Sequence, residues 1–318
     1  MQERLASFVP AADEVHRLKK IDSPEGELFR KIAEQGHYAG RTRPTTTRQG
    51  IYATAPSGEL LASVNTRSAE RVLAMLDEAL EAWGRMPEGE RYLSADQRPD
   101  RGGWRWRELY PVDGLVLRVH SRDLPRDDPP DDWRADASNR DYAWFRGDEL
   151  RGSLPQALTP GARRAVADPI VRRLARLHLV DNVRGQCPAF ADAHVERAEL
   201  TAEVAATDGG RVELALEGST RTVARGKWPV AGYRDMHDPA EQERGVETSL
   251  RGQAVWDTES GRFVAFELLA LGTRWGGTQY NGRGDDLAPG RIGFAFVLAG
   301  DDERVAPAPI RQYGWQQK

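Results

Sequence analysis

Two apolar runs joined by a short polar turn, at residues 252–280 (GQAVWDTESGRFVAFELLALGTRWGGTQY), constrain the fold more than any other stretch of this chain. The turn at residues 257–261 contains Asp and Ser, whose side chains bond nearby backbone, and Gly, which accepts a positive φ. Apolar runs on both sides of such a turn predict a β-hairpin. A helix is the competing interpretation of FVAFELLALG, but the turn and the glycine-rich flanks favour a strand.

Further segments after residue 194 show the alternation that is typical of strands. Apolar and polar side chains alternate over residues 200–206, a turn of Asp-Gly-Gly follows, and the alternation resumes at residues 212–216 and again at 292–298. A period of two indicates strands with one buried face. Five to seven such strands joined by short turns predict a mostly antiparallel β-sandwich or open barrel.

The first 86 residues predict a smaller αβ unit. Residues 24–36 predict a helix, and residues 50–55 and 59–64 predict a hairpin around a Pro-Ser-Gly turn. Apolar residues then recur at helical spacing over residues 72–83, which predicts an amphipathic helix. The candidate N-caps of this helix are Asn65, Thr66 and Ser68.

The order strand, turn, strand, helix in GIYATAPSGELLASV and SAERVLAMLDEALEAW resembles the C-terminal half of a thioredoxin fold. In this resemblance Phe8-Val9-Pro10 takes the place of the central strand, so that it covers residues 8–86. It implies a topology but no redox chemistry, because the strand and helix that carry the redox cysteines in such proteins are not in this sequence. The proline expected just before the penultimate strand is also missing. An unrelated ββα unit is the alternative.

Residues 87–160 form a connecting segment rich in Arg, Asp, Pro and aromatic residues. The run DLPRDDPPDD at 123–132 predicts a loop, and residues 115–119 predict a short strand. Many aromatic rings in a polar stretch argue against disorder. We interpret these rings as pinning loops to a domain surface, and the alternative is a stacking platform for a sugar or a base.

Composition argues against several function classes. The formal net charge of -4 shows no basic excess and does not favour nucleic-acid binding. The single cysteine, Cys187, allows neither an intrachain disulfide nor thiol–disulfide exchange within the chain, and it favours a cytoplasmic location. No run approaches the ~18 apolar residues of a membrane span. The sequence contains no GxGxxG, P-loop or GxSxG motif, and it assigns no cofactor.

The first candidate site lies where a helix predicted to open at Asp168-Pro169 ends, in the run LHLVDNVRG. Four polar side chains follow an apolar helical face within seven positions: His178, Asp181, Asn182 and Arg184. Histidine is a candidate acid or base, aspartate can orient it, and arginine can hold an anion. The alternative is structural, since a histidine on an apolar face is commonly a core residue and Asp or Asn after a helix closes turns.

A second candidate group follows the predicted strand at residues 115–119. It consists of His120, Arg122, Asp123 and Arg126. Arg283 lies in the glycine-containing loop NGRGDD, whose acidic pair has ligand oxygens for Ca²⁺ but not the EF-hand spacing. No HxH or HExxH spacing supports a metal site. A surface ion-pair cluster is the alternative to a binding site here.

Together these features predict an α+β protein with a small thioredoxin-like unit (1–86), a connecting segment (87–160) and a β-rich domain (161–318). They favour a non-redox binding or accessory protein with a polar site at one end of the β-rich domain. Its partner is predicted to be a small molecule or a protein, rather than nucleic acid or a membrane. Candidate ligand-binding residues are His120, Arg122, Asp123, Asn182 and Arg283.

The alternative is a hydrolytic or metal-assisted enzyme. Its candidate catalytic residues are His178, Asp181 and Arg184. A third class is a scaffold whose first unit docks a partner, which predicts a sizeable exposed apolar patch on residues 50–83.

Overall fold

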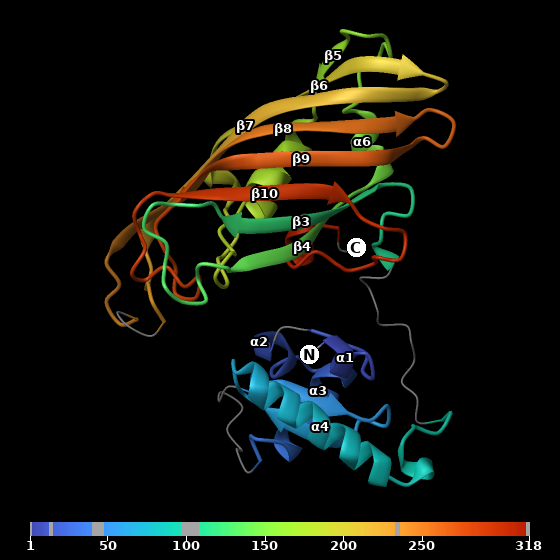
Figure 1. Cartoon of the computed structure of the whole chain (residues 1–318), viewed down its shortest axis with the longest axis vertical. Coiled ribbons are helices and arrows are strands. Elements are labelled where there is room, and N and C mark those ends of the chain that lie inside the picture. Colours follow the sequence, from blue (N-terminus) through green and yellow to red (C-terminus); the bar gives the residue numbers. More distant parts are fainter. Residues whose placement is uncertain (1, 13–14, 40–47, 97–107, 233–235, 316–318) are drawn as a thin grey trace. The chain divides into compact units, whose positions relative to one another are not determined.

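The computed structural model describes residues 2–12, 15–39, 48–96, 108–232 and 236–315. It divides the chain into two compact units, Met1–Gly103 and Trp104–Lys318, each with its own hydrophobic core (Figure 1). The division falls inside the predicted connecting segment 87–160, because strands from that segment hydrogen-bond into the sheet of the second unit.

The first unit packs a hairpin against a long helix, as the sequence predicts. Strand β1 (Ile51–Thr54) pairs antiparallel with β2 (Leu60–Val64), and helix α4 (Ala69–Arg85) follows. The Ser68 hydroxyl accepts a hydrogen bond from the Arg71 backbone N–H at 3.3 Å and so caps α4. The other helices described in this unit are α1 (Gln2–Leu5), α2 (Val15–Leu18), α3 (Pro24–Gln35) and the 3₁₀-helix η1 (Glu88–Glu90).

The strand predicted at Phe8-Val9-Pro10 does not form. The Phe8 N–H donates to the Leu5 carbonyl at 2.9 Å and closes the turn after α1, which leaves Val9 96% exposed. The thioredoxin resemblance therefore stays a prediction that rests on the hairpin and α4. The scaffold hypothesis predicts a sizeable exposed apolar patch on residues 50–83. In this range Ile51, 40% exposed, is the one large apolar side chain with strong exposure, so the hypothesis has little support.

The second unit is built on one antiparallel sheet, which has eight strands in the part of the chain that the structure describes (Figure 1). Their order is β4-β3-β10-β9-β8-β7-β6-β5. The strands are β3 (Leu115–Asp123), β4 (Ser138–Phe145), β5 (Arg163–Ala165), β6 (Val195–Asp208), β7 (Arg211–Lys227), β8 (Glu241–Asp257), β9 (Arg262–Trp275) and β10 (Gly290–Leu298). The hairpin predicted at residues 252–280 is confirmed as the pairing of β8 with β9.

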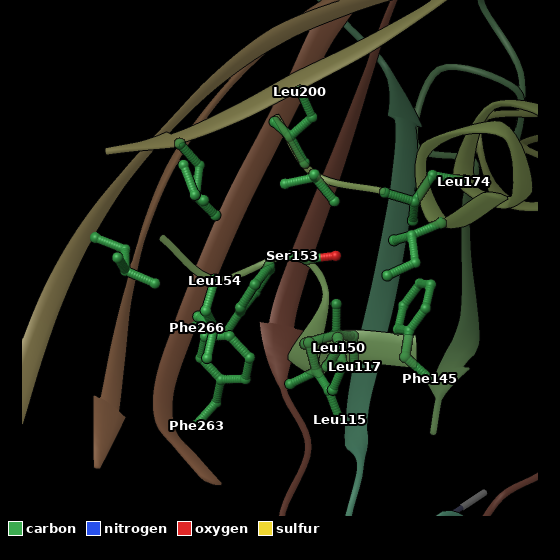
Figure 2. A pocket seen from close by; sticks show the side chains of 15 residues that line it. Leu115, Leu117, Phe145, Leu150, Ser153, Leu154, Leu174, Leu200, Phe263 and Phe266 are labelled. Carbon is green, nitrogen blue, oxygen red and sulfur yellow. The ribbon is translucent and has the colours of Figure 1, made fainter. Parts of the chain in front are cut away.

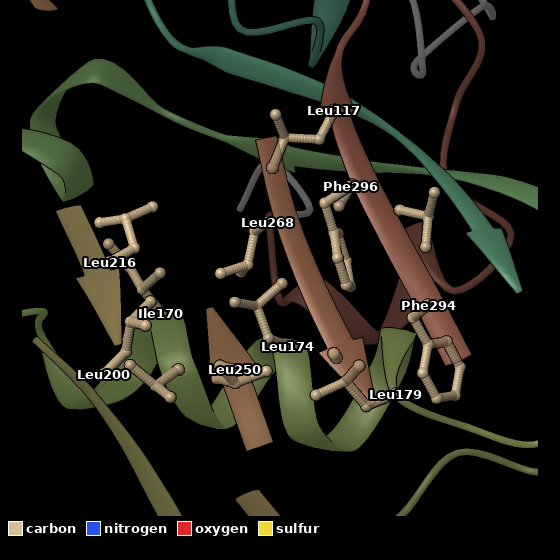
Figure 3. Packing of buried hydrophobic residues seen from close by; sticks show 14 of the residues in the cluster. Leu117, Ile170, Leu174, Leu179, Leu200, Leu216, Leu250, Leu268, Phe294 and Phe296 are labelled. Carbon is tan, nitrogen blue, oxygen red and sulfur yellow. The ribbon is translucent and has the colours of Figure 1, made fainter. Parts of the chain in front are cut away.

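The predicted α+β class with mostly antiparallel strands is confirmed. The strands of the second unit share one open sheet with β4 and β5 at its edges, so they do not form the two stacked sheets of a sandwich. A helix supplies the second layer instead. Helix α7 (Asp168–Arg173) continues into a π-helical turn, η3 (Leu174–His178), and packs on the concave face (Figure 3). Residues that meet in this core include Leu117, Ile170, Leu174, Leu179, Leu250, Leu268, Phe294 and Phe296.

Strands β3 and β4 come from the segment that the sequence predicts to be mainly connecting loops. β3 pairs with β10, and β4 pairs with β3 as an edge strand. The aromatic rings of this segment do fix it in place: Tyr142 and Trp144 pack with Tyr313 and Trp315 of the C-terminal segment. The remaining described elements are α6 (Gly147–Arg151) and the 3₁₀-helices η4 (Asp192–His194) and η5 (Ile310–Tyr313). None of the described helices has the length and apolar character needed to cross a membrane.

Close approach of β8 and β9 depends on a glycine near the end of β9. A Cβ added at Gly272 would lie 1.8 Å from the Glu247 carbonyl oxygen, which is backbone and cannot rotate away. We expect Gly272→Ala to lower the free energy of unfolding by about 1–3 kcal/mol, the range for overpacking. Urea denaturation measures this. Gly152→Ala is the control, because nothing lies within 4 Å of that position, and an equal loss in both variants would contradict the prediction.

Candidate functional site

Four of the predicted site residues meet in one buried ion-pair network at the end of the sheet where β3 ends and β10 begins. They are Asp123, Asp181, Arg184 and Arg283. Asp123 is the last residue of β3, and Arg283 lies 160 positions later, in the loop between β9 and β10. Asp181 and Arg184 reach the same place from the loop that follows η3.

Arg283 is the centre of this network and has no exposed surface. Its Nη1 and Nη2 atoms donate to Asp123 at 2.8 and 2.7 Å, and its Nε and Nη2 atoms donate to Asp181 at 2.8 Å each. Burial alone lowers the pKa of this guanidinium, but the hydrogen bonds and charges of the two carboxylates outweigh it and raise the pKa. The planar fork of arginine therefore joins β3 to the loop after η3.

Asp286 forms the second centre of the network. It accepts hydrogen bonds from Arg184 and Arg274 at 2.7 Å each and from Arg126 at 3.1 Å. Burial alone raises the pKa of Asp286, but the hydrogen bond and charge of Arg274, followed by Arg126 and Arg184, lower it to about 2. Sequence reasoning missed Arg274, since an arginine at the end of an apolar strand carries no local signal of a buried ion pair.

The network contains one more positive than negative charge. Three largely buried carboxylates, Asp123, Asp181 and Asp286, face three buried guanidinium groups, Arg184, Arg274 and Arg283, and the partly exposed Arg126 adds a fourth. All six carboxylate oxygens contact a guanidinium nitrogen, whereas the Nε atoms of Arg184 and Arg274 have no hydrogen-bond partner in the described residues. Because each carboxylate is already bound, the network is built to hold three loops together rather than to receive a ligand.

His178 does not join this network. Its side chain has no exposed surface, its Nε2 lies 2.6 Å from the Tyr313 hydroxyl, and its Nδ1 lies 3.9 Å from Asp141. Burial, with the nearby charge of Arg173, lowers the pKa of His178 to about 3, and burial raises the pKa of Asp141. At neutral pH His178 is therefore an uncharged core residue without access to solvent.

The other predicted site residues have local roles. The Asn182 side chain accepts a hydrogen bond from the Cys187 backbone N–H at 2.8 Å and closes the loop after η3. His120 and Arg122 are exposed on β3. Since successive side chains of a strand point to opposite faces, they are directed away from Asp123. Burial, followed by the charges of two arginines, lowers the pKa of His120.

Cys187 lines a cavity of about 10 Å³ together with Asp181 and Arg244. Burial raises the pKa of the Cys187 thiol to about 11, although the Arg244 Nη1 atom, 3.1 Å from Sγ, acts in the opposite direction. The thiol is therefore protonated at neutral pH, and the space suits about one water molecule. The structure contains no group of three or more His, Cys, Asp or Glu side chains that could hold a metal ion, within the residues that it describes.

A larger cavity of about 50 Å³ lies on the concave face of the sheet (Figure 2). Residues of strands β3, β4, β6, β7 and β9 line it, together with residues of α6, the segment after α6, the segment before α7, α7 and η3. Its lining includes Leu115, Leu154, Leu174, Leu200, Phe263 and Phe266. Among the described lining residues Ser153 is the polar one, and its hydroxyl accepts a hydrogen bond from the Ala167 N–H at 3.2 Å.

Comparison of the chain with protein-family models, curated proteins and solved structures gave no match. The site must therefore be judged on its geometry. Sequence reasoning placed some of the cavity-lining residues in strands and two of them in a helix, but it did not predict a cavity, because unfilled volume depends on how distant segments pack.

Removal of the Arg283 side chain tests the structural role of the network. Arg283→Ala leaves Asp181 buried without its cation and Asp123 with Arg184 alone, so we expect unfolding free energy to fall by about 3–5 kcal/mol. Arg283→Lys should not restore it, because one ammonium cannot bind two carboxylates in a fork. The control is Arg126→Ala, whose side chain is 35% exposed and should matter by less than about 1 kcal/mol. Equal effects at the two positions would contradict this role.

The lowered pKa values of Asp286 and Asp123 predict acid sensitivity. Their unfolded values are about 3.9, so the stability they contribute is present above pH ~4 and is lost as pH falls toward 2. His178 also makes stability fall with falling pH, between its unfolded pKa near 6.5 and its folded pKa of about 3. Asp141, whose folded pKa is raised, has the opposite effect: its contribution favours the folded state at low pH.

Urea unfolding of the wild type at a series of pH values should therefore show stability that begins to fall below about pH 6.5, through His178, and falls further between about pH 4 and 2, through the two carboxylates. The fall should be shallower in Arg283→Ala, because that variant holds Asp123 less tightly in its charged form. A wild type that is as stable at pH 2 as at pH 5 would contradict the prediction.

Proposed function

We propose that this chain is a non-redox binding protein that holds a small apolar ligand in the cavity on the concave face of its sheet. The observation that carries the proposal is the cavity itself, with a volume of about 50 Å³ and a lining of leucine, phenylalanine and other apolar side chains. Ser153 is the one polar side chain in the described lining, and a buried water needs two to four partners, so an apolar group is favoured there.

The polar end of the sheet, where the sequence predicts a site, supports ligand binding less well. Its carboxylates are bound to Arg283, Arg184 and Arg274. An external ligand would have to displace one of these buried ion pairs, which costs several kcal/mol. The proposal therefore keeps the predicted class of a binding protein and moves the ligand to the cavity. The cytoplasmic location stays a prediction.

Catalysis is a weaker candidate because the described cavity lining includes no titratable side chain. The predicted catalytic residues His178 and Asp181 lie in different environments and have different partners. His178 is sealed against Tyr313, and Asp181 is bound to Arg283. A general acid or base must reach the reacting atoms within hydrogen-bond distance, and His178 has no exposed surface from which to do so.

An unfilled cavity has an energetic cost whether it is a ligand site or a packing defect. At about 24 cal/mol per Å³, a volume near 50 Å³ costs roughly 1 kcal/mol. A side chain that fills the space recovers part of this cost in either case. Only a ligand site loses binding when it is filled.

Ala202→Val tests the proposal, because Ala202 is 2% exposed and lines the cavity from β6. A panel of small apolar compounds, linear and cyclic, should raise the melting temperature of the wild type. The variant should bind the same compounds at least tenfold more weakly and unfold at the same or a slightly higher temperature. The matched control is Ala265→Val, at an exposed position of β9, which should bind as the wild type does. Failure of every compound to bind the wild type, or unchanged binding to Ala202→Val, would overturn the proposal.

A further inference from the structure

The volume of the cavity, its lining and the aromatic rings beside it indicate which apolar ligands can bind. We infer that the cavity takes the end of one unbranched aliphatic chain, and that the polar head of the same molecule remains outside. This inference rests on the proposed function, and it names which apolar ligands bind and in which orientation.

Volume argues for a chain rather than a ring. The cavity measures about 50 Å³, room for about four groups of the size of a water molecule. A cavity that holds benzene in another protein measures about 150 Å³. A ring therefore needs the surrounding leucines and phenylalanines to move, which a packed core resists. A straight chain occupies the narrow space one methylene at a time.

The polarity of the lining decides which end of the molecule enters. Ser153 accepts a hydrogen bond from the Ala167 N–H, and the rest of the described lining offers only hydrocarbon. A carboxylate or hydroxyl placed inside would exchange several hydrogen bonds to water for at most the one that the Ser153 O–H can donate. The polar head therefore stays in solvent, and the ligand is a single-chain amphiphile.

Aromatic rings continue the apolar path from the cavity toward solvent. Phe263 and Phe266 line the cavity, are partly exposed, and lie edge to face with ring centres 5.7 Å apart. Figure 2 shows these two rings together beside Leu154, away from Leu174 and Leu200. Trp256 packs on Phe263 with ring centres 4.9 Å apart. A chain longer than the cavity can therefore lie against these rings before its head reaches water.

A series of free alkyl carboxylates tests this inference. Dissociation constants of hexanoate to dodecanoate, each below its critical micelle concentration, are measured by calorimetry at pH 7.5. We expect affinity to rise about fourfold for each added methylene, the factor for burying one such group, and then to level off once the cavity and the aromatic path are filled. Phe266→Ala should weaken the longer chains more than hexanoate, whereas Ala265→Val should leave the series unchanged.

The comparison that decides between chain and ring uses heptanoate and cyclohexanecarboxylate, which have the same number of carbons. Heptanoate should bind at least tenfold more tightly. Equal or tighter binding of the ring, or an affinity independent of chain length, would overturn this inference while leaving an apolar binding site in place. Failure of every chain and every ring would instead overturn the proposed function.

A second experiment distinguishes a free fatty acid from a phospholipid as the source of the aliphatic chain. The protein is incubated with dodecanoate and phosphatidylcholine vesicles together and recovered by size exclusion, and the dodecanoate and phospholipid that it retains are measured. The inference predicts that free dodecanoate is retained and phospholipid is not. Recovery of phospholipid in place of dodecanoate would overturn the assignment to a single-chain amphiphile.

Discussion

The second unit depends on one short helix covering one face of a large antiparallel sheet. The central strands β6 to β9 contain 14 to 17 residues each, a length of roughly 45–60 Å, whereas α7 and η3 together span about 16 Å. The helix can therefore fill only part of the concave face. Helix α6 and the segment that follows it cover an adjacent part, and the apolar cavity lies where these covering elements meet the sheet. The cavity is thus a consequence of the architecture.

Apolar and polar chemistry are separated within this unit. The cavity is lined by hydrocarbon, while the buried charges collect at the end of the sheet where Asp123, Asp181 and Asp286 meet their arginines. A buried ion-pair network adds little net stability, but its geometry is demanding, and removing one partner is costly. Its main effect is to fix the positions of three loops that are far apart in the sequence. The ligand that we propose for the cavity would not disturb those charges, because the described cavity lining includes none of these residues.

Much of the local structure could be predicted from the sequence, because its signals are local. Turn residues between alternating runs gave the β8–β9 and β1–β2 hairpins, and helical spacing gave α4. The alternation also showed that the strands have a buried face, but it carries no information on what covers that face. The helix that begins at Asp168 was predicted, but its place on this face of the sheet was not, and a second sheet was expected there instead. Strand β4, SNRDYAWF, was missed because its first half is polar and it is recognisable only when paired with β3.

The candidate site could be predicted only in part. Asp123, Asp181, Arg184 and Arg283 were singled out by residue type, yet nothing local shows that Arg283 binds two carboxylates that lie about 100 and 160 positions earlier in the chain. His178 was grouped with Asp181 by closeness in sequence, but the helix ends between them and their side chains enter different environments. The cavity left no sequence signal, since its lining residues look like any other core.

Methyl-resolved NMR of leucine-labelled protein during titration with dodecanoate tests the central claim most directly. The account predicts that the signals of Leu115, Leu200 and Leu214, which line the cavity, shift in a saturable way. It predicts that Leu287, beside the ion-pair network, and Leu271, exposed on β9, do not shift. Saturable shifts at Leu287 or Leu271 with unchanged cavity signals would contradict the account and place the ligand elsewhere.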